Sequence, residues 1–171
     1  MLVSGPPTHA RPPQRVGRLK ALATSPRALR LAMNLWPPFL CSGIRVESMA
    51  EDLRHVRVRL AHSPLTSNYV GTLFGGSLFA MTDPFWMMMV LRGLGPGYVV
   101  WDQAAEVTFV APGRGAVSAT FALEEQVLDE LRAAASDGTP VRRWFTTEVV
   151  ADDGTGTVVA RVRKLLYVRR R

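Results

Sequence analysis

The sequence predicts an α+β domain in which an antiparallel sheet is folded round one buried helix. Two observations predict this class. A single apolar segment of helical length, residues 75–92, lies between two groups of segments with strand character. The order of elements is strand, strand, helix, then four strands with one short helix inserted. This order contains no parallel strand–helix–strand repeat, which argues for an antiparallel sheet.

The chain divides into three segments. Residues 1–14 contain four prolines and no apolar period, so we expect a disordered arm. Residues 15–36 are expected to be helical, with a new helix start at Ser25-Pro26, because serine followed by proline is a signal for a helix N-terminus. Residues 37–171 are long enough to bury one substantial core and are expected to form the main domain.

Charge is concentrated at the N-terminus. The net charge of +7 arises within the first 46 residues, which hold seven basic side chains and no acid, whereas residues 47–171 hold fourteen of each sign. A nucleic-acid-binding domain usually carries a basic stripe on its folded part, so we expect no nucleic-acid partner. An arginine-rich, acid-poor N-terminus is also typical of an organelle transit peptide. The leucines between residues 19 and 31 favour instead a helix docked onto the domain.

Composition excludes further classes of protein. A single cysteine excludes an internal disulfide framework and a multi-cysteine metal site. The apolar central segment is too short and too closely flanked by glycine to span a membrane, and no secretory apolar region is present. We therefore expect a cytoplasmic protein with no membrane partner, no metal and no dissociable cofactor.

Alternating hydrophobicity predicts strands over residues 44–49, 56–60 and 117–123, and turn signals bound the others. Residues 44–49 and 56–60 are expected to form an antiparallel pair with one wet face, on which Arg57 and Arg59 lie. Glycine-rich and proline-rich turns separate the later strands, and acids at its start suit a polar helix inserted among them. These later elements are strands over residues 98–110, 117–123, 141–151 and 157–168 and a helix over residues 124–135.

The central segment contains one ionisable side chain within its apolar run, Asp83. A carboxylate in such a setting caps a helix, pairs with another group or does chemistry. The run begins after Gly75-Gly76 and has no strand alternation, so we predict one helix over residues 75–92 with a kink at Pro84. The alternative is a helix that starts at Pro84, with Asp83 as its cap.

The spacing of these residues carries a resemblance to a known family. Asn68 lies seven positions before Gly75, and Asp83 lies seven after Gly76. With the Phe109–Gly113 segment and the Asp153-Gly154 turn, these residues make the chain from about Asn34 to Arg169 resemble the hotdog-fold thioesterases of the phenylacetate-degradation type. More narrowly, the chain resembles an uncharacterised bacterial branch of thioesterase-like proteins, the DUF4442 type. One departure is Phe74, which stands where that pattern usually has histidine.

The resemblance implies a hotdog fold and a homo-oligomer, dimer or tetramer, that hydrolyses acyl thioesters of coenzyme A or of a carrier protein. In this interpretation the backbone N–H groups of Gly75 and Gly76 polarise the thioester carbonyl at the positive end of the helix. Asp83 attacks the thioester or activates water, and the Asn68 amide orients the carboxylate or the water. The alternative is a non-catalytic protein that binds acyl thioesters.

Each of these residues also has a structural alternative. The glycines allow tight packing at a helix start, Asp83 caps a helix, and Asn68 forms a turn. Asp102 and Glu106, on the strand after the helix, either face the site or are solvated or paired elsewhere.

The distance between the two proposed halves of the site suggests a further expectation. Gly75 and Asp83 are about 12 Å apart along one helix, too far for both to touch the same thioester carbonyl. We therefore expect a composite site built from two chains.

Overall fold

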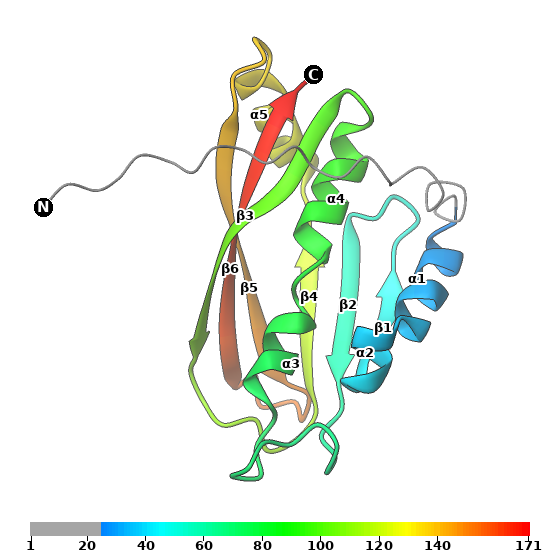
Figure 1. Ribbon diagram of the computed structural model, residues 1–171, viewed down its shortest axis with the longest axis vertical. Helices are drawn as coiled ribbons and strands as arrows, with labels where there is room; N and C mark the ends of the chain where they lie inside the picture. Colours follow the sequence, from blue (N-terminus) through cyan, green and yellow to red (C-terminus); the bar gives the residue numbers. More distant parts are fainter. Residues whose placement is uncertain (1–24) are drawn as a thin grey trace, which may run out of the picture.

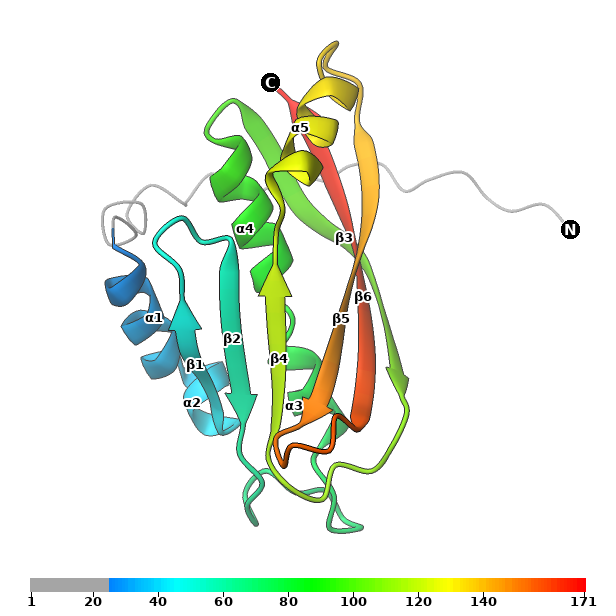
Figure 2. The ribbon, with the colours of Figure 1, turned by 180° about the vertical axis from the view of Figure 1, so that it is seen from behind.

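The computed structural model describes residues 25–171, which form a six-stranded antiparallel sheet and five helices (Figures 1 and 2). The predicted arm over residues 1–14 and residues 15–24 of the predicted helical segment lie outside the described residues. The strand order is β1-β2-β4-β5-β6-β3. The strands are β1 (Ile44–Met49), β2 (His55–Leu60), β3 (Tyr98–Phe109), β4 (Val117–Ala122), β5 (Val141–Ala151) and β6 (Val158–Arg170). The helices are α1 (Pro26–Leu35), α2 (Pro37–Cys41), α3 (Gly75–Ala80), α4 (Phe85–Leu94) and α5 (Glu125–Ala134).

All six predicted strands and the inserted helix are present, and each bound lies within two residues of its expected position. The alternation that predicted β2 also places its faces. Val58 and Leu60 of β2 are buried, whereas Arg57 and Arg59 lie on the outer face and pair with Asp152. The period-two pattern was sufficient for β2 because one of its faces packs against the core and the other meets water. By contrast, β3 is exposed or half-buried on both faces over residues 101–109.

The central segment is two helices, so the prediction of one kinked helix is wrong. Residues 81–84 form a turn between α3 and α4. Proline has no N–H to donate, and its ring clashes with the carbonyl four residues earlier, so Pro84 interrupts the helical hydrogen bonds. The backbone N–H groups of Thr82 and Asp83 donate instead to carbonyls three residues earlier, at 2.9 and 3.3 Å. The alternative was also wrong about Asp83, because α4 begins at Phe85 without a side-chain cap.

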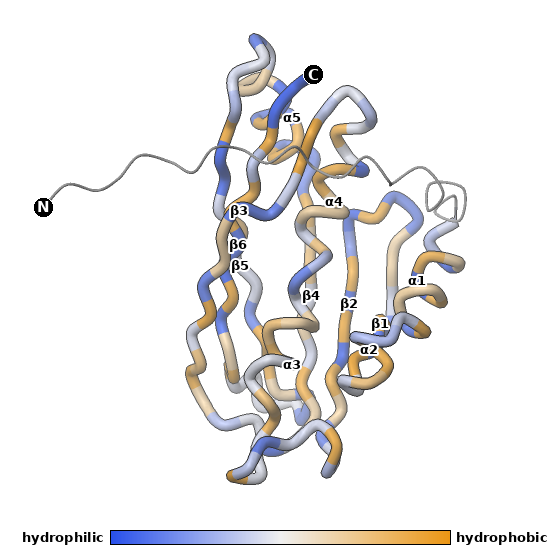
Figure 3. The backbone as a smooth tube through the Cα atoms, viewed as in Figure 1, coloured by the Kyte–Doolittle hydropathy of each residue, from blue (hydrophilic) through white to orange (hydrophobic). Residues whose placement is uncertain are grey.

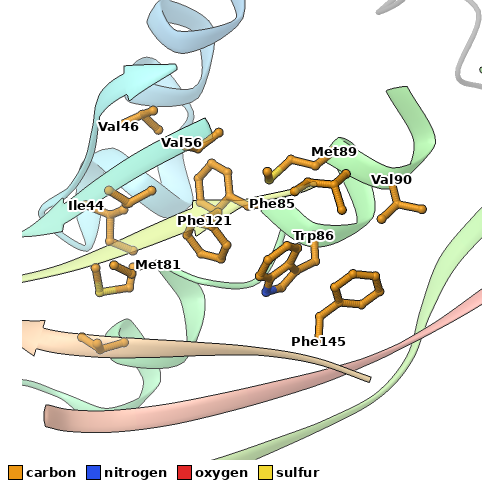
Figure 4. Close-up of a cluster of buried hydrophobic side chains, with 14 of the residues drawn as sticks. Ile44, Val46, Val56, Met81, Phe85, Trp86, Met89, Val90, Phe121 and Phe145 are labelled. Carbon is orange, nitrogen blue, oxygen red and sulfur yellow. The ribbon is translucent and has the colours of Figure 1, made fainter. Parts of the chain in front are cut away.

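The two helices cover one face of the sheet, which we call the inner face. Figure 1 shows α3 and α4 arranged one after the other along that face, and Figure 3 draws both largely toward the orange, hydrophobic end of the scale. Aromatic rings join α4 to the sheet, as Figure 4 shows. The Phe85 and Phe121 centroids lie 4.9 Å apart, as do those of Trp86 and Phe145, and Trp86 donates its Nε1–H to Thr147 Oγ1 at 2.6 Å. Each fully buried aromatic contributes roughly 1.5–3 kcal/mol of transfer free energy.

The two edges of the sheet differ. At the β1 edge, the Asn34 side chain from α1 donates to the Val46 carbonyl at 3.2 Å and accepts from the Val46 N–H at 2.7 Å. Arg30 donates to the Glu47 carbonyl at 2.7 Å. The opposite edge is β3, beside which the described residues place no further strand. One edge is therefore occupied by a helix, and the other is open.

Candidate functional site

A buried lysine lies at the centre of the candidate site. Lys164 comes from the inner face of β6, and its side chain is 3% exposed. Its Nζ lies 2.6 Å from Asp83 Oδ1 and 3.4 Å from Asp102 Oδ1. Carboxylates from the turn after α3 and from β3 therefore meet on one ammonium group from β6.

Asp83 reaches from this cluster into solvent. Its side chain is 49% exposed, although its Oδ1 accepts a hydrogen bond from the buried Lys164 ammonium. Within residues 25–171, its second oxygen, Oδ2, accepts no hydrogen bond. The carboxylate thus has one oxygen held by a charge-assisted bond and one available to a ligand.

Asp102 lies at the same place, just before a β-bulge in β3. Register shifts between Asp102 and Ala104, so that Asp102 pairs with Leu166 and Ala105 pairs with Lys164. Residues opposite each other on antiparallel strands share a face, so Asp102 lies on the inner face beside Lys164. Its Oδ1 is buried and makes no hydrogen bond to any described residue. Burial raises the pKa of this carboxyl, and the nearby Lys164 charge opposes that rise only in part.

Glu106 takes no part in the cluster. It pairs with Arg163 of β6, whose Nη1 lies 2.7 Å from Glu106 Oε2, and both side chains are exposed. The sequence left open whether Asp102 or Glu106 faces the site. The structure brings Asp102 to it and leaves Glu106 on the outer face.

The glycine pair lies under two aromatic rings. A side chain at Gly75 would place its Cβ 2.8 Å from the Phe109 ring, and one at Gly76 would overlap the Phe74 ring. Both rings are more than half exposed. The absence of side chains therefore permits close aromatic packing at the start of α3. In the described part of the chain, the N–H groups of Gly75 and Gly76, in the first turn of α3, donate no hydrogen bond.

Asn68 is engaged within its own loop. Its Oδ1 accepts from the backbone N–H groups of Val70 and Thr72, both at 3.1 Å. Its Nδ2 donates to Thr72 Oγ1 at 2.9 Å and approaches the Leu73 carbonyl at 3.4 Å. These contacts use all the hydrogen-bonding capacity of a primary amide. In this geometry Asn68 shapes the loop that leads into α3.

Lys164 is the site residue that sequence reasoning missed. It is one of only two lysines in the chain, and the other basic side chains are arginines. A signal was available, because Lys164 falls in phase with Val162 and Leu166, which are both buried. A two-residue count along the last strand would place the lysine on the inner face.

The cluster differs from a metal site. Among residues 25–171, no group of three or more histidine, cysteine, aspartate or glutamate side chains could hold a metal ion. The two carboxylates are joined by a lysine.

In the same range, no helix is both long and apolar enough to cross a membrane.

Comparison with known proteins identifies the fold. A model of the family DUF4442, described as a domain of unknown function, matches residues 25–168. No curated protein matches the sequence.

Three solved structures show the likeness. PA5026 from Pseudomonas aeruginosa, a protein of unknown function described as a "Probable Thioesterase", aligns with a TM-score of 0.74 and 18% identity over 85% of this chain and 95% of that one. Thioesterase HI1161 from Haemophilus influenzae aligns with a TM-score of 0.60 and 14% identity, over 85% and 91%. Thioesterase superfamily member 2 from Mus musculus aligns with a TM-score of 0.57 and 17% identity, over 83% and 96%. These alignments confirm the predicted hotdog fold.

Proposed function

The chain belongs to the DUF4442 family, and we propose that it hydrolyses acyl thioesters of coenzyme A or of an acyl carrier protein, with Asp83 as the reacting carboxylate. The observation that carries this proposal is the position of Asp83. Its carboxylate is half-exposed at the turn between α3 and α4, and one oxygen is anchored to the buried Lys164 ammonium. A fixed, accessible carboxylate is what either of two hydrolytic routes requires.

The two routes differ in the bond that Asp83 makes. As a nucleophile, the carboxylate adds to the thioester carbonyl and expels the thiolate, and water then hydrolyses the resulting mixed anhydride. As a general base, it takes a proton from the water that attacks the carbonyl, and the thiol leaves with a proton. Both routes give a free acid and a free thiol, and both need a donor for the oxygen that becomes negative.

The N–H groups of Gly75 and Gly76 are the proposed donors for that oxygen. They lie at the start of α3, whereas Asp83 follows its other end. A helix of six residues is about 9 Å long. The glycine N–H groups and the Asp83 carboxylate of one chain are therefore too far apart to contact the same carbonyl. The composite site is therefore part of the proposal, with the glycines of one protomer beside Asp83 of another. Asn68 supports the site by shaping the loop before α3.

The open β3 edge is the proposed dimer contact. It offers the backbone groups of a strand of 12 residues, whereas α1 occupies the β1 edge. An unpaired edge of this length readily pairs with a second chain. Dimer formation through this edge would bring two protomers side by side.

Subunit complementation tests the composite site. Asp83→Asn removes the carboxylate and Gly75→Pro removes an N–H. The new Cβ would lie 2.8 Å from the Phe109 ring, so this exposed ring must move aside, and folding of the variant is confirmed first. A heterodimer of these inactive chains holds one site with both halves intact. With random exchange, half the dimers are mixed and each has one working site, so about a quarter of wild-type turnover should return. No recovery despite measured subunit exchange would contradict the composite site.

A non-catalytic acyl-thioester binder is the second candidate, and Phe74 favours it. That ring lies against Gly76, next to the proposed oxyanion donors, where the resembled pattern has a polar side chain. The deciding experiment measures free-thiol release from a panel of acyl-coenzyme A esters by the purified full chain. Steady turnover supports hydrolysis, whereas saturable binding without thiol release would establish the binder.

A further inference from the structure

Along the middle of β6, the inner face is apolar except at Lys164. Its other inward residues along the middle of the strand, Val162, Leu166 and Val168, are buried hydrophobics. A charged ammonium at Lys164 loses its hydration there, and this loss destabilises the fold unless other groups compensate it. The compensating groups should therefore reveal what the lysine does.

Three groups surround the Lys164 ammonium. Asp83 Oδ1 takes a short hydrogen bond at 2.6 Å, and Asp102 Oδ1 lies at 3.4 Å without a hydrogen bond to any residue that the structure describes. The Phe79 ring centroid lies 5.3 Å away, close enough for a cation–π contact. One positive charge thus faces two carboxylates, of which only one is hydrogen-bonded to it.

The pairing fixes Asp83 at the boundary between core and solvent. Because Lys164 is buried and comes from the rigid middle of a strand, it can orient the carboxylate better than an exposed, flexible lysine could. The hydrogen bond to Oδ1 holds the side chain in one orientation and leaves Oδ2 as the oxygen that can react.

The second carboxylate becomes important when Asp83 reacts. A nucleophilic Asp83 loses its negative charge when it forms the anhydride, and a general base loses it when it takes a proton. Either step would leave the buried ammonium without its partner. Asp102, with its Oδ1 unoccupied at 3.4 Å, is placed to accept the hydrogen bond that Asp83 gives up.

We propose that Lys164 is a positioning residue of this site, which orients the Asp83 carboxylate, and that Asp102 compensates the lysine charge while the Asp83 charge is consumed. This role rests on the proposed thioester hydrolysis. In this proposal Asp83 reacts, Lys164 orients it, and Asp102 balances the lysine charge during the reaction.

A double-mutant cycle tests the role. Lys164→Met keeps the length and apolar stem of the side chain but removes its charge. We expect it to lower kcat roughly 100-fold, the scale of a misplaced reacting group, with little change in KM. In the Asp83→Asn background the same substitution should lower kcat no further, because Lys164 acts through Asp83. Arg161→Met is the matched control, since Arg161 is an exposed cation on the outer face of the same strand, and its kcat should stay at the wild-type value.

Melting temperature supplies a readout that does not need turnover. Asp83→Asn weakens the pairing of a buried ammonium, so adding Lys164→Met should raise the melting temperature of that variant. If Lys164→Met alone fails to fold, Asp102→Asn replaces it in the cycle, with a smaller expected loss of kcat that also disappears in the Asp83→Asn background.

The outcomes separate the two proposals. Wild-type protein that releases no thiol overturns the hydrolase and this role with it, while the melting temperatures still report whether the ion pair couples the two residues. Wild-type turnover combined with an unchanged kcat in Lys164→Met overturns the positioning role alone. That role is also overturned if Lys164→Met lowers kcat by the same factor in the wild-type and Asp83→Asn backgrounds.

Discussion

Two cations of β6 form ion pairs on opposite faces of the sheet. On the outer face, Arg161 Nη2 lies 2.6 Å from Glu148 Oε1, and the side chains are 49% and 44% exposed. On the inner face, Lys164 Nζ lies 2.6 Å from Asp83 Oδ1, but the lysine side chain is only 3% exposed. The two contacts are equally short and differ in their surroundings. Burial, rather than distance, decides what each contributes to stability and chemistry.

The difference lies in what happens when a pair is broken. An arginine that loses an exposed partner is hydrated at once, so the pair contributes little. A buried ammonium that loses its partner has no water to replace it. We therefore expect the fold to tolerate changes among its outer arginines but to depend on the acids around Lys164.

The largest expected effect is on turnover. Asp83→Asn keeps the shape of the side chain and removes its charge, so we expect kcat to fall at least about 100-fold, the scale of a lost base or nucleophile. Glu148→Gln is the matched control, because it neutralises the acid paired with Arg161 on the outer face, and it should retain wild-type kcat. Thiol-release assays of both folded variants make the comparison. Wild-type turnover in Asp83→Asn would remove Asp83 from the chemistry.

The next effect is on stability. Replacing both Asp83 and Asp102 with alanine leaves the Lys164 ammonium buried without a carboxylate, which we expect to lower the free energy of unfolding by about 3–5 kcal/mol. Adding Lys164→Met should recover most of that loss. Denaturant unfolding at one protomer concentration measures both changes. A double variant as stable as the wild type would show that the buried charge needs no partner.

A pH effect should distinguish Asp102 from the outer acids. Burial raises its pKa in the folded state above the ordinary value of 3.8, so the folded chain holds this proton more tightly than the unfolded chain does. The resulting stabilisation is complete below the unfolded pKa and is lost as the pH rises through the folded pKa. Asp102→Asn has no such proton, so the stability of the wild type relative to this variant should fall as pH rises from about 3 toward 7. A constant difference over that range would contradict the assignment.

The smallest effect is expected on the outer face. Asp152 bridges Arg57 and Arg59 at 2.8 and 2.7 Å, and both arginine side chains are well exposed. Asp152→Asn should lower the free energy of unfolding by about 1 kcal/mol or less, and added salt should reduce the difference further. Turnover should not change. If Asp152→Asn lowered the free energy of unfolding as much as the replacement of both Asp83 and Asp102 by alanine, the expected difference between the inner and outer faces would be wrong.

The sequence was informative where a pattern repeats along an element. Alternation placed β1, β2 and β4, and turn signals bounded the other three strands, each within two residues. The break at residues 81–84 was predicted only as a kink at Pro84, because apolar residues flank it on both sides and hydrophobicity does not reveal which carbonyls lose their donors at the proline.

The site was predicted less completely because it depends on contacts between distant elements. Asp83 was identified as the lone charge in an apolar run, but Lys164 is 81 residues away and follows arginines that lie on the other face. A bulge that inserts one residue into β3 just after Asp102 turns Glu106, which is an even number of residues further on, to the opposite face. A shift of one residue reverses the face of every side chain that follows, and the sequence here carries no glycine to mark it.

The Asn34 side chain, which occupies both hydrogen-bonding groups of Val46, has a consequence for the size of any assembly. A sheet with two exposed edges can add chains at both ends and grow into a fibre. Here α1 terminates one end, so a protomer can extend its sheet only once, through β3. Pairing of two identical β3 edges is isologous and closes on a two-fold axis. Because α1 covers the β1 edge, such a dimer has no free sheet edge through which further chains could add.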